Sequence, residues 1–133
     1  MFFRYGEVMT PKITANMEDY LETIHLIEAE QGSVRVKDIA GRMCISCASV
    51  SEAVKSLDRQ GLVSHPRYDL ISLTERGAEI ARRIYERHRI IRRFLRDVLL
   101  LDAETAEEDA CRIEHSMSPK TVDRLREFLE ASR

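Results

Sequence analysis

The spacing of apolar residues predicts six helices and two short strands along this 133-residue chain. The first helix begins at Met17 after Asn16 as its N-cap and ends before Gly32. Apolar side chains recur within it at every third or fourth position: Tyr20, Leu21, Ile24 and Ile27. Residues 1–16 show no such periodicity and contain Pro11, so we expect a flexible N-terminal tail.

Two short helices joined by a tight turn come next. One covers Val36–Met43, and the other begins after Ser46 as its N-cap and ends near Gly61. Such a pair is the helix-turn-helix unit, whose second helix enters the DNA major groove. Residues 62–73 then form two strand-like runs on either side of Pro66, which is the pattern of a small β wing.

Three further helices complete the predicted order. Thr74 caps a long helix over Glu75–Leu100, a second covers Ala103–Met117, and Ser118-Pro119 opens the last. We therefore predict a mostly α fold, with a winged helix-turn-helix domain over residues 17–78 and a helical module over residues 79–133. The apolar stripes of this module exceed what it can bury alone, so we expect it to form a homodimer.

The formal net charge of −2 conceals a basic middle between acidic ends: residues 1–34 carry −4, residues 35–93 carry +6 and residues 97–133 carry −5. This distribution predicts a polyanion-binding surface on one module and cation ligands on the others. No apolar run is long enough to span a membrane, and three cysteines do not make a disulfide framework. We expect a cytoplasmic protein with reduced thiols and no membrane partner.

The predicted second helix of the helix-turn-helix carries small or polar side chains outward, which permits close approach to base edges. We expect these side chains to face the major groove: Ser46, Ala48, Ser49, Ser51 and Glu52. Phosphate contacts are expected from basic side chains of this helix, its predecessor and the wing: Lys37, Arg42, Lys55, Arg59 and Arg67. The alternative is that these charges form an ordinary solvated face.

Cys44 and Cys47 form a C-x-x-C sequence within the predicted turn. A structural zinc site needs about four ligands, and no second such pair lies nearby. We interpret both as ordinary cysteines, at least one of them partly buried.

Two helical segments place candidate metal ligands on a shared face. Asp19 and Glu22 lie three residues apart, while Cys111, Glu114 and His115 occupy positions i, i+3 and i+4. A thiolate, a carboxylate and an imidazole at that spacing can bind one cation. The long helix adds a further candidate in His88, which lies between two arginines.

Three segments carry a resemblance to a known family: residues 17–22, residues 87–89 and residues 110–118. Together with the order of the predicted elements, they resemble the diphtheria-toxin-repressor family of metal-dependent regulators, including its manganese-transport-regulator branch. The resemblance covers residues 17–133 and implies a DNA-binding domain followed by a metal-binding and dimerisation domain. It also implies that the family's optional SH3-like domain is missing, because the chain ends at Arg133.

The resemblance implies a primary metal site made by Asp19, Cys111, Glu114 and His115. Asp19 is similar to the manganese branch, whereas Cys111 is similar to the iron branch. Glu22 and His88 match ligands of the manganese branch's second metal, but Cys111 occupies the position of its bridging carboxylate.

The second site of the iron branch has its ligands at the positions of Arg92 and Glu107. We therefore expect the iron-branch form of the second site to be absent. Glu107 and Glu108 are candidates to replace its missing ligands.

These features predict a DNA-binding transcriptional regulator that represses metal uptake genes when Fe(II) or Mn(II) binds. The thiolate of Cys111 tilts the preference toward Fe(II), and Zn(II), Co(II) or Ni(II) should also bind in vitro. We expect the cation to bridge the first helix and the helical module, and so to set the spacing of two recognition helices on double-stranded operator DNA.

Two other classes of protein share some of these sequence features. A winged-helix regulator could instead sense an oxidant or a small molecule through Cys44, Cys47 or Cys111, and would then ignore chelators. A hydrolytic metalloenzyme is disfavoured, because Glu114-His115 is not the H-E-x-x-H motif and the chain has no Gly-rich phosphate loop. We expect no enzymatic activity.

Overall fold

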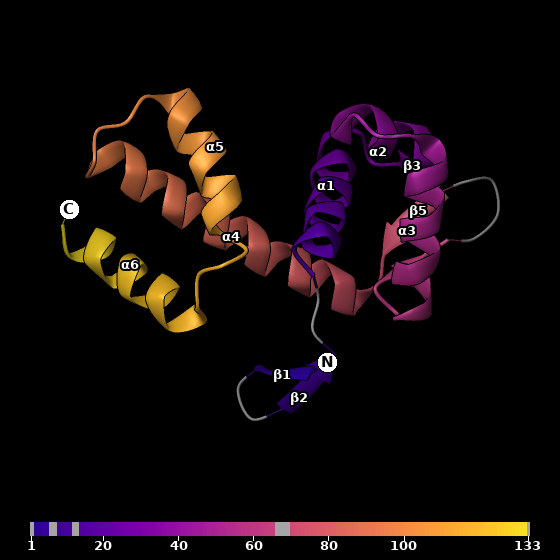
Figure 1. Cartoon of the computed structure of the whole chain (residues 1–133), viewed down its shortest axis with the longest axis horizontal. Coiled ribbons are helices and arrows are strands. Elements are labelled where there is room, and N and C mark those ends of the chain that lie inside the picture. Colours follow the sequence, from indigo (N-terminus) through magenta and orange to yellow (C-terminus); the bar gives the residue numbers. More distant parts are fainter. Residues whose placement is uncertain (1, 6–7, 12–13, 66–69, 133) are drawn as a thin grey trace. The chain divides into compact units, whose positions relative to one another are not determined.

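A computed structural model describes residues 2–5, 8–11, 14–65 and 70–132, which divide into two compact units, Met1–Ile80 and Ala81–Arg133. We call them the N-terminal and the C-terminal unit (Figure 1). Among the described residues, none of the helices combines the length and the apolar character that crossing a bilayer requires.

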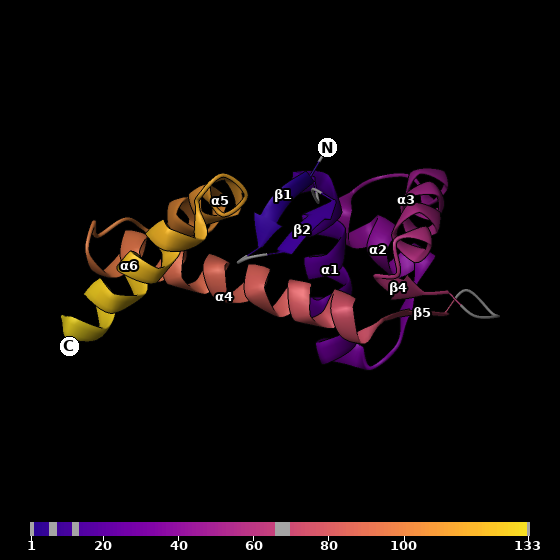
Figure 2. The same ribbon diagram turned by 90° about the horizontal axis from the view of Figure 1, so that it is seen from below.

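The N-terminal unit is a winged helix-turn-helix, as predicted. It contains helices α1 (Ala15–Gln31), α2 (Val36–Met43) and α3 (Cys47–Arg59), together with a small antiparallel sheet of three strands in the order β3-β5-β4. The strands are β3 (Val34–Arg35), β4 (Val63–Ser64) and β5 (Leu70–Leu73), and Figure 2 shows β4 and β5 side by side. The first strand of this sheet was not predicted, because two residues are too few for an alternating pattern.

Two further strands lie near the N-terminus. β1 (Phe2–Tyr5) pairs antiparallel with β2 (Val8–Pro11), in a segment where the absence of periodicity predicted no secondary structure. The helix that follows also begins earlier than expected, because Thr14 and not Asn16 is its N-cap and accepts a hydrogen bond from the Met17 backbone N–H.

The core of the N-terminal unit comes from the residues that the helical and strand patterns place inward. Helix α1 buries Leu21 and Ile24, α2 buries Ile39, and α3 buries Val50 and Val54 completely. Ser46 caps α3 by accepting a hydrogen bond from the Ser49 backbone N–H, as predicted. These contacts hold α3 against the other two helices and leave its opposite face in solvent.

The C-terminal unit contains most of α4 (Glu75–Asp97), with α5 (Ala103–Ile113) and α6 (Pro119–Ala131) on either side of it (Figure 1). Ile91 and Leu95 of α4 pack against Ala106 and Ala110 of α5. Ile90 packs in a second cluster with two buried residues of α6, Val122 and Leu129. The small alanine side chains, both fully buried, permit a close approach of α5 to α4.

Helices α4 and α5 end earlier than the apolar pattern predicted. After Asp97 the chain turns, Leu100 adopts a left-handed conformation with φ of 60°, and the Leu101 N–H donates to the Leu95 carbonyl. Helix α5 ends at Ile113, so Glu114 is its C-cap and His115 follows in the turn. Apolar residues follow the end of each helix in the sequence, and for this reason the predicted helices were too long.

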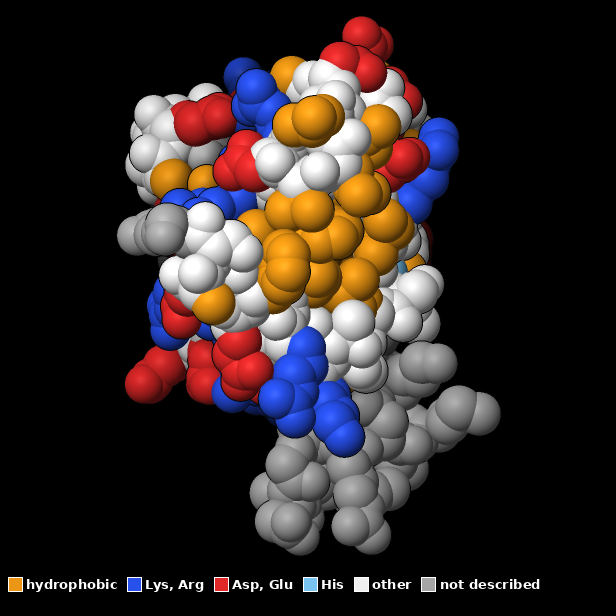
Figure 3. Space-filling view, turned by 90° about the vertical axis from the view of Figure 1, so that its left-hand side faces the viewer, with side chains coloured by type: hydrophobic (Ala, Val, Ile, Leu, Met, Phe, Trp, Pro, Cys, Tyr) orange, Lys and Arg blue, Asp and Glu red, His pale blue; other side chains and the backbone are white. Residues whose placement is uncertain are grey.

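Figure 3 shows hydrophobic side chains gathered in a patch on the side where the C-terminal unit lies in Figure 1. The large apolar residues most exposed in this unit are Val98, Leu99, Leu100 and Phe128. Leu100 is 79% exposed, so its apolar side chain contributes little to the hydrophobic stabilisation of this unit alone.

The start of α4 depends on a glycine. Gly77 lies buried in the first turn, and a Cβ added there would collide with the backbone carbonyl of Leu62, which also accepts a hydrogen bond from the Thr74 N–H. We predict that Gly77→Ala destabilises the protein by about 1–3 kcal/mol, since neither backbone can move without breaking this junction. Urea unfolding followed by circular dichroism measures the change.

The matched control is Gly41→Ala, in the middle of α2. Its Cβ would meet nothing within 4 Å, so we expect this substitution to stabilise the protein by roughly 0.5–1 kcal/mol through higher helix propensity. Equal effects of the two substitutions would contradict the role assigned to Gly77.

Candidate functional site

A cluster of polar side chains lies between α4 and α5 in the C-terminal unit. Its centre is His88, which is only 5% exposed. His88 Nδ1 lies 2.8 Å from Glu114 Oε2, and Nε2 lies 3.0 Å from both carboxylate oxygens of Glu107. Cys111 Sγ lies 3.9 Å from Nδ1. Sequence reasoning therefore selected three residues that the fold does bring together.

Glu114 is the most deeply buried polar residue of this cluster, at 1% exposure. Its Oε1 has no hydrogen-bond partner among the described residues, although His115 Nε2 lies 3.5 Å away. The Arg87 guanidinium donates to the Glu114 backbone carbonyl at 2.8 Å and so fixes the end of α5. A buried carboxylate oxygen without a donor costs free energy that a bound cation would recover, so the donor set fits a metal ion.

The surroundings of His88 favour its charged form. Its pKa is raised from 6.5 to about 11, because Cys111 and Glu114 face its Nδ1 and Glu107 faces its Nε2, while burial opposes the shift. The pKa of Glu107 lies below its usual range: partial burial raises it, but hydrogen bonds from His88 and Arg92 lower it by more. Without a metal, this cluster is thus an imidazolium held between two carboxylates.

The other predicted ligands lie on helix α1 in the N-terminal unit. Asp19 and Glu22 are half-buried there, one turn apart, and Glu18 beside them is 7% exposed. The spacing therefore places the two predicted carboxylates on one side of the helix, as expected.

The predicted base-reading residues lie on the exposed face of α3, with Ser51 half-buried. Ala48, Ser49 and Glu52 are exposed, but the Ser46 hydroxyl is bonded to Ser49 Oγ at 3.0 Å while it caps the helix. Ser46 thus has a structural role that competes with base recognition.

The predicted phosphate contacts differ in their availability. Lys37 and Arg59 are exposed, and Lys55 is 63% exposed with its ammonium 3.6 Å from Glu52. The Arg42 guanidinium makes two hydrogen bonds to Glu30 of α1, at 2.6 and 2.8 Å, and this pair lowers the pKa of Glu30. Arg67 lies outside the described residues. Arg35, which was not among the predicted contacts, lines a pocket together with Lys37 and Ser51.

The cysteines of the turn are both exposed, so the prediction that one of them is partly buried is wrong. The reason is local: Cys44 is the C-cap of α2 in a left-handed conformation, with φ of 57°, and Cys47 begins α3 on its outer side. Neither side chain faces the core.

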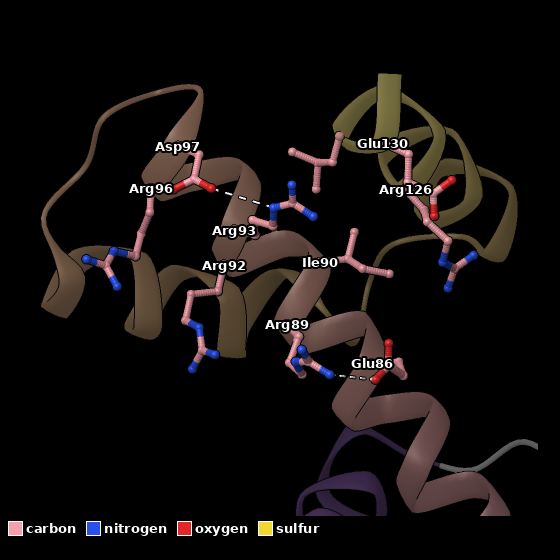
Figure 4. Close-up of a pocket in the computed structure, with 10 residues that line it drawn as sticks. Glu86, Arg89, Ile90, Arg92, Arg93, Arg96, Asp97, Arg126 and Glu130 are labelled. Atoms are coloured by element: carbon pink, nitrogen blue, oxygen red, sulfur yellow. Dashed lines mark hydrogen bonds and ion pairs between the residues drawn. The ribbon is translucent and has the colours of Figure 1, made fainter. Parts of the chain in front are cut away.

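The basic middle of the sequence is distributed differently from our interpretation. Residues 35–80 carry a net charge of only +1, whereas residues 81–93, within the C-terminal unit, carry +5. Several of these arginines line a pocket of about 590 Å³ between α4 and α6 (Figure 4). In it Arg89 pairs with Glu86, and Arg93 with Asp97. The pocket contains none of the predicted metal ligands.

Two further residues belong to the polar cluster: Glu107, which the sequence offered only as a candidate to replace a missing ligand, and Arg92, which was not predicted to take part. Glu107 bonds to His88, and Arg92 donates to Glu107 Oε2 at 3.2 Å. The sequence feature that could have identified both residues is their helical spacing from predicted ligands. Glu107 lies one turn before Cys111, and Arg92 lies one turn after His88.

Comparison with known proteins agrees with both units. A family model for the N-terminal DNA-binding domain of iron-dependent repressors matches residues 12–70. A second model, for the metal-binding and dimerisation domain of these repressors, matches residues 74–133.

Individual relatives cover most of the chain. It is 37% identical over 119 residues to the uncharacterized HTH-type transcriptional regulator MJ0568 of Methanocaldococcus jannaschii, covering 89% of this chain and 95% of that protein. It is 33% identical over 117 residues to the HTH-type transcriptional regulator MntR of Bacillus subtilis, covering 88% and 82% of the two proteins.

Among solved structures, that of the manganese regulator SloR is similar, with a TM-score of 0.77 and 36% sequence identity. The alignment covers 89% of this chain but 55% of that one, so the chain spans little more than half the length of SloR. The winged helix-turn-helix with a helical second domain, predicted from the sequence, is confirmed by this likeness. The chain therefore belongs to the iron-dependent repressor family of metal-dependent transcriptional regulators.

Proposed function

We propose that this protein is a repressor of metal uptake genes that binds operator DNA as a homodimer when Fe(II) or Mn(II) is bound. The observation that carries the proposal is Glu114, whose buried carboxylate has one oxygen without a hydrogen-bond donor among the described residues, beside His88 and His115. A divalent cation supplies there the positive charge that a buried carboxylate requires.

Asp19 and Glu22 of α1 are proposed to share that cation with Cys111, Glu114 and His115. Carboxylates from one unit and an imidazole from the other would then hold the two units in a single arrangement, with Cys111 adding a thiolate. Without a cation, carboxylates of the two units repel each other and oppose that arrangement. The cation thus acts through its differential affinity for the DNA-competent arrangement.

The donor set bears on the choice of metal. Carboxylates with one or two imidazoles suit both Mn(II) and Fe(II), and the thiolate of Cys111 moves the preference toward Fe(II). The similarity to MntR and SloR, the latter described as a manganese regulator, supports Mn(II) as the other candidate. Zn(II), Co(II) and Ni(II) should bind in vitro and compete by intrinsic affinity.

The homodimer is proposed to form through the C-terminal unit. Val98, Leu99, Leu100 and Phe128 expose apolar surface there, and the matching domain model is described as a dimerisation domain. Two recognition helices in a dimer must meet half-sites about 34–36 Å apart, so their separation decides whether DNA binds.

Glu114→Gln tests the metal site. The amide keeps the shape of the side chain but removes its charge, so the metal concentration for half-maximal DNA binding should rise about 10–100-fold or more. Fluorescence anisotropy measures this on a duplex selected from a random library with the Mn(II)-loaded protein. Glu108→Gln, an exposed carboxylate of the same helix, is the matched control and should change nothing. Unchanged activation of Glu114→Gln would exclude the proposed site.

Lys55→Ala tests the DNA-binding face of α3. If Lys55 contacts a phosphate, the substitution should weaken binding to every duplex alike and reduce the slope of log K against log salt by about 0.9. Lys120→Ala, an exposed lysine of α6, serves as the control and should leave the slope unaltered. A loss confined to one base pair would assign Lys55 to base recognition.

A further inference from the structure

The pocket between α4 and α6 is lined mainly by arginines (Figure 4). Its volume of about 590 Å³ lies within the range of about 300–1,000 Å³ that is usual for sites of small organic ligands. Among the described residues that line it, five are arginines and three are carboxylates, so the lining carries a net charge of +2. All of them belong to the C-terminal unit. We propose that this pocket binds a small organic phosphate through arginines of both helices.

Helical spacing brings the arginines of α4 together. Arg89, Arg93 and Arg96 follow one another at intervals of four and three residues, so their side chains lie along one side of the helix. Arg92 is a neighbour of this row, because it is three residues from Arg89 and four residues from Arg96. Like charges at such spacings destabilise a helix, and a bound anion would remove that cost.

The arginines of the pocket are paired with carboxylates only at the surface. Arg93 lies 3.6 Å from Asp97 on α4, and Arg126 lies 2.8 Å from Asp123 on α6. Both carboxylate side chains are 64% exposed. Exposed ion pairs contribute little to stability, so the exchange of such a carboxylate for a bound anion costs little free energy. Each guanidinium also has five N–H donors, of which one carboxylate accepts only some.

Two apolar side chains line the same pocket. Ile90 of α4 and Leu129 of α6 are 9% and 4% exposed and belong to one hydrophobic cluster. Their packing fixes α4 against α6, and with the helices the arginines that each of them carries. The surface that they turn to the pocket favours an apolar group. The lining therefore fits a ligand with an organic body and an anionic head.

The charge of the lining favours a phosphate as that head. A phosphate monoester carries nearly two negative charges near neutral pH, which matches the net charge of the pocket, and it has three acceptor oxygens. Arginine can bind two phosphate oxygens at once through its planar fork. Figure 4 shows the Arg93 side chain directed from α4 toward α6, which carries Arg126. One phosphate would thus connect the two helices.

This site is independent of the proposed function. None of the predicted metal ligands is among its described lining residues, and neither are the exposed apolar side chains proposed for the homodimer. Arg92 also donates to Glu107 of the polar cluster, so the test leaves Arg92 unchanged. The binding of a phosphate can therefore be measured on the metal-free protein.

Phenyl phosphate is the probe, because it joins a phosphate to a single apolar ring. Isothermal titration calorimetry of the metal-free full chain should show saturable binding, with inorganic phosphate about tenfold weaker and phenol not bound. Arg93→Gln and Arg126→Gln should each raise the dissociation constant about 10–100-fold, because each removes charge-assisted hydrogen bonds. Arg124→Gln removes the same charge from an exposed position of α6 outside the pocket, and this matched control should change the constant little.

The outcomes separate a built site from a general attraction of anions. No saturable binding of phenyl phosphate, or equal weakening in Arg124→Gln and Arg126→Gln, would overturn the site. Equal affinity for inorganic phosphate would exclude an organic ligand. Displacement of the probe by a DNA duplex of arbitrary sequence would assign these arginines to the DNA backbone and overturn the proposal as well. Far-ultraviolet circular dichroism verifies that each variant is folded.

Discussion

The buried carboxylate of Glu114 is the constraint on which the C-terminal unit depends. It lies at the end of α5, is 1% exposed, and faces the imidazole of His88 at 2.8 Å. A carboxylate so deeply buried is strongly unfavourable unless positive charge lies beside it, and in the absence of metal His88 supplies that charge. The same need for charge is the basis of the proposed cation site, since one oxygen of Glu114 still has no hydrogen-bond donor among the described residues.

Much of the fold could be predicted because its boundaries are marked locally. Helix α2 has the predicted bounds Val36–Met43, and Ser46 caps α3 as it was expected to do. The ends of α4 and α5 were overestimated because apolar residues continue past them: Val98, Leu99 and Leu100 follow the last turn of α4, but Leu100 takes a left-handed conformation with φ of 60°. The strands β1 and β2 have no periodic signal at all.

The candidate site was predictable where the spacing of residues within one helix decides it. Cys111 and Glu114 share a face of α5, and the fold brings both to His88, as shown by their contacts with its Nδ1. Glu107 could not be distinguished from a solvated glutamate, because only the packing of Ala106 and Ala110 against α4 turns it toward His88. The charge pattern misled for a different reason: the +6 of residues 35–93 was assigned to one surface, although most of it lies beyond Ile80, in the C-terminal unit.

That distribution of charge changes what must account for DNA binding. With a net charge of only +1 over residues 35–80, the winged helix-turn-helix has little long-range attraction for DNA by itself. In the proposed homodimer, affinity would come from a few well-placed contacts that two recognition helices make with their half-sites together. The proposed cation, by fixing the arrangement of the two units, would then decide whether those contacts form, and weak intrinsic binding would leave the metal-free protein off the DNA. By linkage, DNA would tighten the binding of the proposed cation by the same factor by which that cation tightens the binding of DNA.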